Sequence, residues 1–501
     1  MKTRRTLMTE ASKAFLQEHF SSSLLGYAIS RRWYAHKAIK AERLEILSAF
    51  SLDSSGTIKA LVCEITFAGD WRALYFIPVE ISEKEDDNAI GSFVINGGRI
   101  TLTDAFLSRR YAESLLANFL LGANVYDGDS HISFSVTDSF YVPQNLEFRV
   151  IKSEQSNSSF ILGNSIIIKN YRNIKPGENP DIDVPEKLFA QGGFRETPEP
   201  MGDVAYYGRS GKIYLAYASR FIPDSEDAWS RYNRLFSDLL RRSTEDHSFE
   251  EKFPVEFIRA ADSLGKLTGR MHRALSSIGS QNFTPEGVEE TDITRVTNQI
   301  REYLENARAM IGEREEISTR VRMKFALDKW SPTLEYAEDY LLSKLRESHA
   351  QKIRVHGDYH LGQILMAGDS YYVIDFEGEP MKDISERIRK YPPEKDIAGM
   401  IRSLDYLLQS VFKLNGIGGS EEFINSTRVR AENAFVDAYR ETVGADLGLL
   451  GSDPEFADMM LRMFVAEKSA YELLYELNNR PDWVKVPLNS ISRIFSEFKM
   501  K

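Results

Sequence analysis

The sequence predicts an α+β chain with a β-rich part that is followed by a mostly helical part. Up to about residue 222, short runs of β-branched and aromatic residues alternate with Gly, Pro and Asn turns, which is typical of strands. After residue 223, apolar residues recur at the helical period of 3.6 over long segments. A chain of 501 residues is long enough for two or three separately packed lobes.

The first part of the chain reads as a small α/β unit, which we define as an N-terminal cap at residues 1–95. An amphipathic helix opens it, and strands are expected at residues 43–51, 57–67 and 71–80. A helical segment at residues 104–121 follows the cap.

Residues 96–222 are expected to form a further β-rich lobe that ends at a hinge. Its strands are predicted at residues 146–151, 159–162, 165–171, 204–208 and 212–218.

Residues 223–501 are expected to form the helical C-terminal lobe. Helices are predicted at residues 228–242, 254–278, 293–310 and 317–348, and again from residue 395, with short strands at 352–356 and 371–376. The Glu-, Thr- and Asn-rich run at residues 288–305 is expected to be a solvated surface segment.

Composition narrows the class of protein. The formal net charge is -11, so non-specific nucleic-acid binding is not expected. The only cysteine, Cys63, lies in an apolar run and is expected to be a buried, inert thiol. The basic N-terminus is followed by no apolar signal region, and no stretch approaches 18 apolar residues. We therefore expect a cytoplasmic protein that does not bind membranes.

The most informative motif runs from His356 through Asp358 to Gln363, and an apolar strand then leads to Asp375. Phosphoryl transfer needs a carboxylate that orients the attacking hydroxyl, and hard oxygen ligands that hold Mg²⁺ on the phosphates. Asp358 and Gln363 have the five-residue spacing of a kinase catalytic Asp and its metal-binding amide. We expect Asp358 to be the catalytic base, and Gln363 and Asp375 to be the metal ligands.

Two other interpretations of this motif remain open. His356 and His360 have the i, i+4 spacing of zinc ligands, although Gly357 and the preceding strand argue against a helix there. The motif would otherwise be a polar turn between two strands.

A second group of residues is expected to bind ATP. A Ser-rich loop at residues 152–159 has small polar side chains that let backbone N–H groups approach phosphate, and Lys169 follows one strand later. A plain hairpin turn is the alternative. Asp183 or Glu186 is expected to pair with Lys169, and the hinge is expected to receive adenine. The expected nucleotide-binding residues are Ser153, Gln155, Ser156, Asn157, Ser158, Lys169, Asp183, Ser219, Phe221 and Ile222.

The order of loop, lysine, hinge, catalytic Asp and metal Asp indicates a bilobal protein-kinase-like fold. The chain also resembles bacterial maltokinases, both stand-alone and fused to trehalose synthase, in the aminoglycoside-phosphotransferase-like branch of that fold. The strings Asp375-Phe376-Glu377-Gly378-Glu379-Pro380 and Tyr475–Trp483 carry the resemblance most specifically. The resemblance implies transfer of the ATP γ-phosphate to the anomeric hydroxyl of maltose, in a route to α-glucan, and an association with trehalose synthase. It also implies that residues 1–95 are an N-terminal cap, residues 96–222 an intermediate nucleotide-binding lobe and residues 223–501 the C-terminal lobe with the sugar site.

One face of a C-terminal helix suits a sugar, because aromatic rings pack on C–H faces and carboxylates accept hydroxyls. A solvated face with Lys468 and Glu472 as an ion pair is the alternative, and His272 is expected to be structural. The expected sugar-binding residues are His360, Glu377, Arg402, Asp405, Lys468, Tyr471, Glu472, Tyr475 and Glu476.

Departures from the resembling family bear on the acceptor more than on the phosphoryl chemistry. His36 stands where that family usually has Gly, and residues 381–393 differ from its usual linker. A kinase for another sugar, an amino sugar such as glucosamine, or an aminoglycoside is the alternative within this chemistry. A pseudokinase scaffold is the alternative of a different class, and the intact set of Lys169, Asp358, Gln363 and Asp375 disfavours it.

Overall fold

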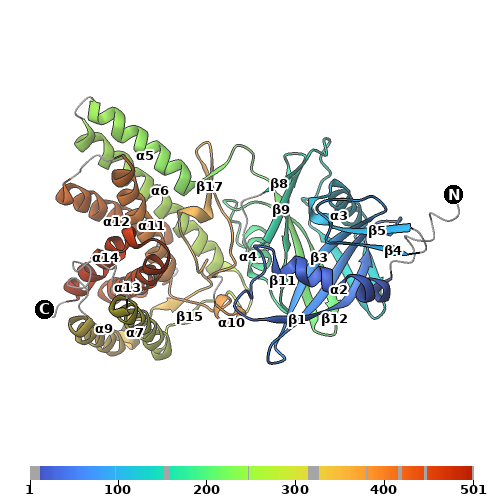
Figure 1. The fold of residues 1–501 in the computed structure, drawn as a ribbon. Coiled ribbons are helices and arrows are strands. Elements are labelled where there is room, and N and C mark those ends of the chain that lie inside the picture. The colour runs from blue at the N-terminus through green and yellow to red at the C-terminus, as the bar shows by residue number, and fades with distance from the viewer. Residues whose placement is uncertain are drawn as a thin grey trace. The chain divides into compact units, whose positions relative to one another are not determined.

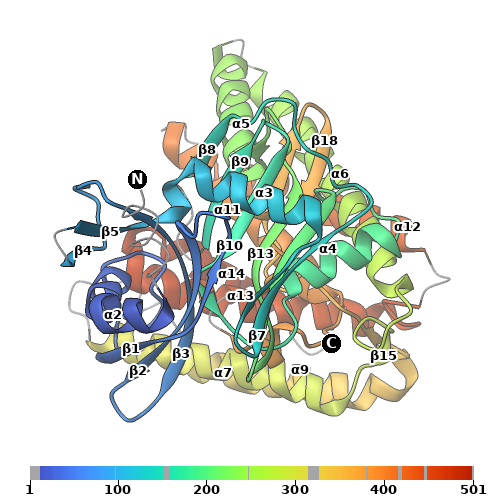
Figure 2. The same cartoon turned by 90° about the vertical axis from the view of Figure 1, so that its right-hand side faces the viewer.

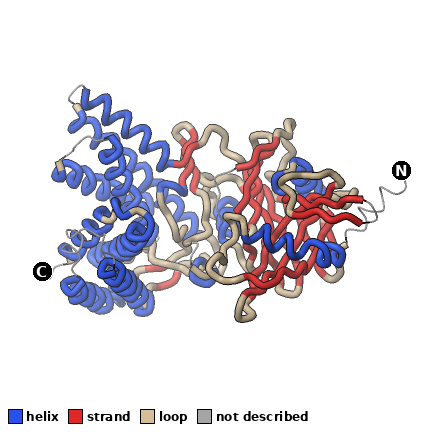
Figure 3. Tube along the Cα trace, in the orientation of Figure 1, coloured by secondary structure: helices blue, strands red, loops and turns tan. Residues whose placement is uncertain are grey.

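The computed structural model describes residues 12–95, 98–151, 157–245, 248–313, 327–379, 382–415, 420–444 and 448–498. The predicted α+β class is confirmed: antiparallel strands dominate up to Arg220, and helices dominate after it (Figures 1 and 3). None of the described helices is long and apolar enough to cross a membrane.

The chain divides into two compact units. The first contains residues 1–186 and 198–223, and the second contains residues 187–197 and 224–501. The chain leaves the first unit for the last time after Pro223, next to the predicted hinge. The short segment 187–197 belongs to the helical unit, which the prediction of three contiguous domains did not anticipate.

The first unit begins with α2 (Lys13–Ile29), which lies along an antiparallel sheet of order β1-β2-β3-β5-β4 (Figure 2). Ser12 caps the helix by accepting a hydrogen bond from the Phe15 N–H. The strands are β1 (Ala41–Ser51), β2 (Ile58–Phe67), β3 (Arg72–Ser82), β4 (Gly91–Ile95) and β5 (Gly98–Asp104), and β11 (Asn173–Ile174) pairs with β3. Cys63 is buried in this sheet, as expected.

The second sheet of this unit has the order β6-β7-β12-β13-β10-β9-β8. Its strands are β6 (Asn124–Asp127), β7 (Ser130–Val136), β8 (Phe148–Ile151), β9 (Asn157–Leu162), β10 (Ile166–Tyr171), β12 (Pro200–Gly208) and β13 (Gly211–Arg220). The 3₁₀ helix η1 (Ala105–Leu107), α3 (Arg109–Leu121) and α4 (Pro180–Ala190) complete it. β10 lies between β9 and β13, so Lys169 faces Ser159 and Tyr217 in register.

The second unit is mostly helical. Its helices are α5 (Ala228–Glu245), α6 (Phe249–Ser277), α7 (Glu290–Glu313), α9 (Leu327–Ser348), α10 (Ile384–Arg387), α11 (Glu394–Asn415), α12 (Glu421–Val443), α13 (Pro454–Asn479) and α14 (Lys485–Glu497), with 3₁₀ helices η2 (Leu361–Gln363) and η4 (Pro481–Trp483). Its short strands are β14 (Glu226–Asp227), β15 (Glu286–Gly287), β16 (Gln351–Lys352), β17 (Ile364–Ala367) and β18 (Ser370–Val373). The predicted start of α9 at residue 317 lies outside the described residues.

Two predictions about this unit need correction. The run at residues 288–305 is not a solvated segment, because α7 buries Ile293, Ile300 and Leu304. The strand predicted at 352–356 pairs only at its beginning. Ile353 forms an isolated bridge to Tyr391, and the N–H groups of His356 and Gly357 bond to the Asp396 side chain instead of a neighbouring strand.

Candidate active site

One buried carboxylate, that of Asp396, holds the loop that carries Asp358. Asp396, in the first turn of α11, accepts hydrogen bonds from the N–H groups of His356 at 2.7 Å and Gly357 at 2.9 Å. Gly357 has a φ of +89°, which an L side chain rarely adopts. Two backbone donors on one fixed carboxylate set the direction in which the loop presents Asp358.

Asp396 is itself fixed by His272 of α6. The His272 ring bonds to Asp396 Oδ2 through Nε2 at 3.1 Å and to the Tyr439 hydroxyl through Nδ1 at 2.9 Å. Burial raises the pKa of Asp396, but the hydrogen bonds and charges of His272 and its other neighbours outweigh burial and hold that pKa below its usual value. Both side chains are buried, so the expected structural role of His272 agrees with its surroundings.

Gln363 and Asp375 lie next to each other. Gln363 Nε2 donates to Asp375 Oδ2 at 3.2 Å, and the Ile374 N–H donates to the Gln363 carbonyl at 2.9 Å. Asp375 has a φ of +64°, a strained conformation that is common at functional loops. Because the amide nitrogen bonds to Asp375, the amide oxygen of Gln363 is the group that remains for a cation. An amide and a carboxylate oxygen are the hard donors that Mg²⁺ accepts.

Asp358 shares its carboxylate with Lys468 of α13. Lys468 Nζ donates to Asp358 Oδ1 at 3.1 Å, and both side chains are about one-fifth exposed. Burial lowers the pKa of Lys468, but the charges of Asp358, Glu379 and Glu472 outweigh it and raise that pKa above its usual value. Lys468 was predicted to bind sugar, and the structure joins it to the proposed base.

The two histidines of the motif are engaged with the backbone. His356 Nε2 bonds to the Ile374 carbonyl at 3.0 Å, and His360 Nδ1 accepts from the Gly362 N–H at 3.0 Å. Burial lowers the pKa of His360, although the charges of Asp358 and Asp375 oppose this. His356 bonds to the backbone through both ring nitrogens, because its Nδ1 also accepts from the Asp358 N–H at 3.4 Å, and this favours the kinase interpretation of the motif over the zinc one.

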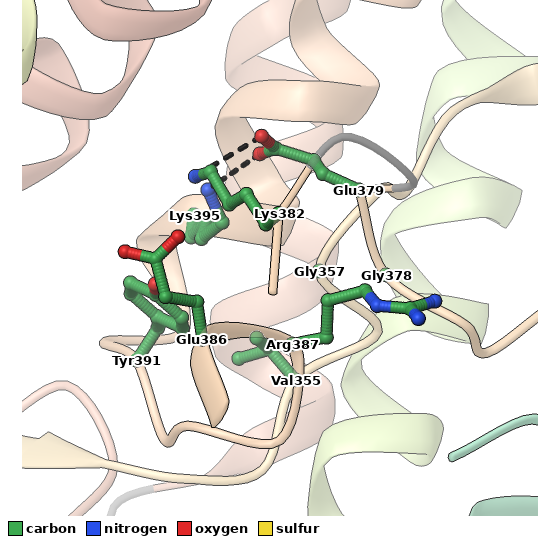
Figure 4. Close-up of a pocket in the computed structure, with 9 residues that line it drawn as sticks. All are labelled: Val355, Gly357, Gly378, Glu379, Lys382, Glu386, Arg387, Tyr391 and Lys395. Carbon is green, nitrogen blue, oxygen red and sulfur yellow. Dashed lines mark hydrogen bonds and ion pairs between the residues drawn. The ribbon is translucent and has the colours of Figure 1, made fainter. Parts of the chain in front are cut away.

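A small pocket behind the loop is organised by Glu379. Lys382 and Lys395 both approach its carboxylate, each at 3.0 Å (Figure 4). Burial raises the pKa of Glu379, but these lysines and Lys468 bring it down to about 2. The Arg387 side chain points away from Glu379 and its two lysines (Figure 4). Arg387 Nη1 lies 3.6 Å from Oε2 of Glu377, which was predicted to bind sugar.

The predicted sugar face contains a buried ionic network between α11 and α13. Arg402 donates to Glu472 Oε2 from Nε at 2.9 Å and from Nη2 at 2.7 Å, and to Asp405 Oδ2 from Nη1 at 2.5 Å. Asp405 Oδ1 is buried and has no hydrogen-bond partner within the described parts of the chain. An unpaired carboxylate oxygen is costly to bury and is a natural acceptor for a ligand donor.

The rest of this face is divided between bonded and exposed groups. Glu476 accepts from Arg480 Nη2 at 2.6 Å and from the Tyr406 hydroxyl at 3.3 Å. Tyr471 and Tyr475 are 37% and 46% exposed, so their rings are available to a ligand. Arg480 was not among the predicted site residues, and its spacing of four residues from Glu476 was the available signal.

In the first unit, Lys169 pairs with an acid that was not among the predicted partners. Lys169 Nζ lies 2.7 Å from Asp181 Oδ2, and the Tyr171 hydroxyl donates to the same oxygen at 2.8 Å. Asp183, one of the two predicted partners, accepts a hydrogen bond from the Asn179 N–H at 3.0 Å, at the N-terminus of α4. The two residues lie in the same helical turn, and sequence spacing does not separate their roles.

The other predicted nucleotide residues are only partly described. Ser153, Gln155 and Ser156 lie outside the described residues, whereas Asn157 and Ser158 open β9. At the predicted hinge, the Phe221 N–H donates to the Ser165 carbonyl at 2.8 Å, because the β13–β10 pairing continues one residue beyond the strand. That N–H is therefore not free for adenine, while Ser219 and Ile222 are buried beside it.

Comparisons with known proteins find relatives of this chain. Residues 227–406, which contain Asp358, Gln363 and Asp375, match the model of the phosphotransferase enzyme family. A glucosamine kinase from Streptacidiphilus jiangxiensis is 28% identical over 354 residues, which cover 70% of this chain and 74% of that protein. A glucosamine kinase from Mycolicibacterium smegmatis is 22% identical over 365 residues, which cover 70% and 80%.

A solved structure extends the likeness to nearly the whole chain. A glucosamine kinase in complex with glucosamine, ADP and inorganic phosphate has a TM-score of 0.65 and 23% identity, covering 95% of this chain and 99% of that one. The shared fold confirms the predicted kinase-like architecture. The two bacterial relatives are both named glucosamine kinases.

Proposed function

We propose that this chain is an ATP-dependent kinase whose acceptor is an amino sugar of the glucosamine type. The observation that carries the proposal is the arrangement of the Asp358 loop. Asp396 fixes this loop, and the paired Gln363 and Asp375 follow it. All four residues lie in the stretch that matches the phosphotransferase family. The expected association with trehalose synthase stays a prediction.

Asp358 would orient the acceptor hydroxyl and accept its proton. Lys468 holds one carboxylate oxygen, so the other oxygen can receive the hydroxyl hydrogen. Gln363 and Asp375 would hold Mg²⁺, which neutralises charge on the phosphates when it is bound. Lys169 would neutralise the α- and β-phosphates of ATP. Because phosphoryl transfer needs little covalent help, these positioned charges would be the main contribution of the protein to the reaction.

An amine on the sugar is supported by the two bacterial relatives, which are both named glucosamine kinases, and by one carboxylate oxygen of the predicted sugar face. Arg402 pairs with Asp405 and Glu472, and Arg480 pairs with Glu476, whereas Asp405 Oδ1 is buried without a partner among the described residues. A protonated amine would supply the positive donor that such an oxygen accepts. The exposed rings of Tyr471 and Tyr475 would pack on the C–H face of the sugar.

An acceptor panel tests the proposal. The protein is incubated with Mg·ATP and glucosamine, maltose, glucose or kanamycin, and ADP release and the phosphorylated product are measured. We expect the highest kcat/KM with glucosamine. A preference for maltose would keep the kinase chemistry and replace the acceptor. Release of ADP with none of them, together with tight binding of a partner protein, would support the scaffold alternative.

The variant Asp358→Asn tests the mechanism. It keeps the shape of the side chain and removes the basic oxygen, so we expect kcat to fall by about 10²–10⁴. The Kd for ADP should stay within about threefold of wild type. Asp262→Asn is a matched control, because Asp262 pairs with Lys266 on an exposed face of α6. Turnover by Asp358→Asn at the wild-type rate would exclude Asp358 as the base.

A further inference from the structure

In the structure the sheet of the cap extends beyond residue 95, because β5, which ends at Asp104, belongs to it. A buried arginine joins this cap to β10, the strand that carries Lys169. Arg172 directly follows β10 and is 1% exposed. Its Nη2 donates to Asp104 Oδ2 at 2.9 Å, and its Nε donates to Ser158 Oγ at 3.1 Å. Asp104 ends β5 in the first sheet, and Ser158 lies in β9 of the second. One guanidinium therefore bonds to both sheets of this unit.

The cap side is built to hold that guanidinium. The Tyr27 hydroxyl donates to Asp104 Oδ2 at 2.6 Å, and Asp104 Oδ1 accepts from the Phe106 N–H at 3.0 Å. The guanidinium lies 5.3 Å from the ring centre of Trp33 and 5.1 Å from that of Phe106. A buried cation needs such bonded and aromatic partners, because desolvation of a charge is costly.

The backbone makes a second connection at the same place. The Phe76 N–H of β3 donates to the Arg172 carbonyl at 2.9 Å, and β11 then pairs with β3. Arg172 is thus the residue at which the chain passes from the second sheet to the first. The cap therefore bonds to both the side chain and the backbone of Arg172.

The nucleotide side of this network includes the residues expected to hold phosphate. Ser158 faces Asn170 in the β9–β10 register, and Ser159 faces Lys169. Asn170 is fully buried, and its Oδ1 accepts from the Tyr111 hydroxyl of α3 at 2.7 Å. Any shift of Arg172 would therefore move the strand that positions the Lys169 amine.

The network also carries unused donors. Arg172 Nη1 and Asn170 Nδ2 are buried and have no hydrogen-bond partner in the described parts of the chain. A buried donor without a partner destabilises the folded state, because it loses its hydrogen bond to water. A hydrophobic contact between the sheets would avoid that cost, so a polar junction at this position calls for a role besides stability.

We propose that the cap fixes the nucleotide-binding strands through Asp104, Arg172 and Ser158, with Arg172 as a positioning residue for ATP. The role rests on the proposed function, because it requires ATP to bind at Lys169. It assigns the cap a share in nucleotide affinity and none in acceptor recognition. A cap that only stabilised the fold would change the melting temperature and leave the Kd for ADP unchanged.

Two Tyr→Phe variants in the cap make a matched test. Tyr27→Phe removes the hydroxyl bonded to Asp104, and Tyr75→Phe removes a hydroxyl that shares a 2.6 Å hydrogen bond with His36. Calorimetric titration with Mg·ADP should show a Kd that is about threefold to tenfold weaker in Tyr27→Phe, which is the worth of one hydrogen bond. Tyr75→Phe should bind Mg·ADP within twofold of wild type, and both variants should keep the wild-type KM for glucosamine.

A double-mutant cycle tests whether the effect travels along the network. We expect Tyr27→Phe and Ser158→Ala to be coupled, so that their combined effect on the Kd is at least threefold smaller than the product of the two single effects. Independent effects, or equal Kd values for Tyr27→Phe and Tyr75→Phe, would overturn the positioning role alone. Absence of ADP binding by the wild-type protein would instead contradict the proposed function, and this role with it.

Discussion

Lys468 shows what a single residue adds to a motif that the sequence already reveals. The spacing of Asp358, Gln363 and Asp375 was visible because all three lie within one short stretch. The partner of Asp358 was not, because Lys468 is distant in sequence and reaches it from α13. Helical spacing placed Lys468 on a polar face and could only suggest a sugar contact. Its bond to Asp358 depends on how α13 packs in the helical unit.

The variant Lys468→Met tests that bond. A hydrogen bond to a charged group contributes about 1.5–3 kcal/mol, and without it the carboxylate can rotate away from the acceptor hydroxyl. We expect kcat to fall by about 10- to 100-fold with the Kd for ADP within threefold of wild type. Lys266→Met is the control, because Lys266 also pairs with an Asp but on an exposed helix face. Equal kcat values for the two variants would contradict a role of Lys468 in orienting Asp358.

At the scale of elements, the boundaries of most strands and helices followed from local pattern. β9 and β10 start and end within two residues of their predicted limits, because β-branched runs and turn residues mark them clearly. The strand expected at 352–356 failed for a tertiary reason, since Asp396 of α11 takes the N–H groups that a neighbouring strand would have bonded. An acidic residue in the first turn of a helix is common, so the sequence does not single out Asp396. Its burial in the folded protein is what distinguishes it.

Burial also makes the start of α11 sensitive to pH. Burial raises the pKa of Glu394, the first residue of the helix, to about 7, although the Glu394 N–H and Arg440 oppose the shift. Between pH 4.5 and 7 the folded state keeps a proton that the unfolded state has lost, so this group makes folding less favourable as pH rises. Glu394→Gln removes that cost, which is on the order of 3 kcal/mol above pH 7.

Urea unfolding as a function of pH measures this effect. The free energy of unfolding of Glu394→Gln should exceed that of wild type above pH 7, and the difference should shrink as pH falls toward 4.5. Glu421→Gln is the matched control, because Glu421 is also the first residue of a helix, α12, but is exposed. A difference that is the same at pH 5 and pH 8 would show that Glu394 is ionised in the folded protein.

For the whole molecule, the sequence predicted a passage near residue 222 but treated each domain as one continuous segment. The described structure gives residues 187–197 to the helical unit, where Leu188 and Phe194 are buried. Glu196 accepts from the Val373 N–H at 2.8 Å and from Arg270 Nε at 2.7 Å. Composition cannot reveal this exchange, because the segment is short and contains two glycines, which read as a loop.

Because residues 187–197 belong to the helical unit, they are expected to be needed for a stable fragment of that unit. A fragment of residues 224–501 lacks Leu188 and Phe194, and burying these side chains stabilises the unit by about 3–6 kcal/mol. We expect this fragment to unfold at much lower urea concentration than the same fragment with residues 187–197 joined ahead of Asp224 by a flexible linker. The control is the linked fragment with Leu188→Ser and Phe194→Ser, which should lose the gain. Equal urea midpoints for all three proteins would show that the segment is not part of the core of the helical unit.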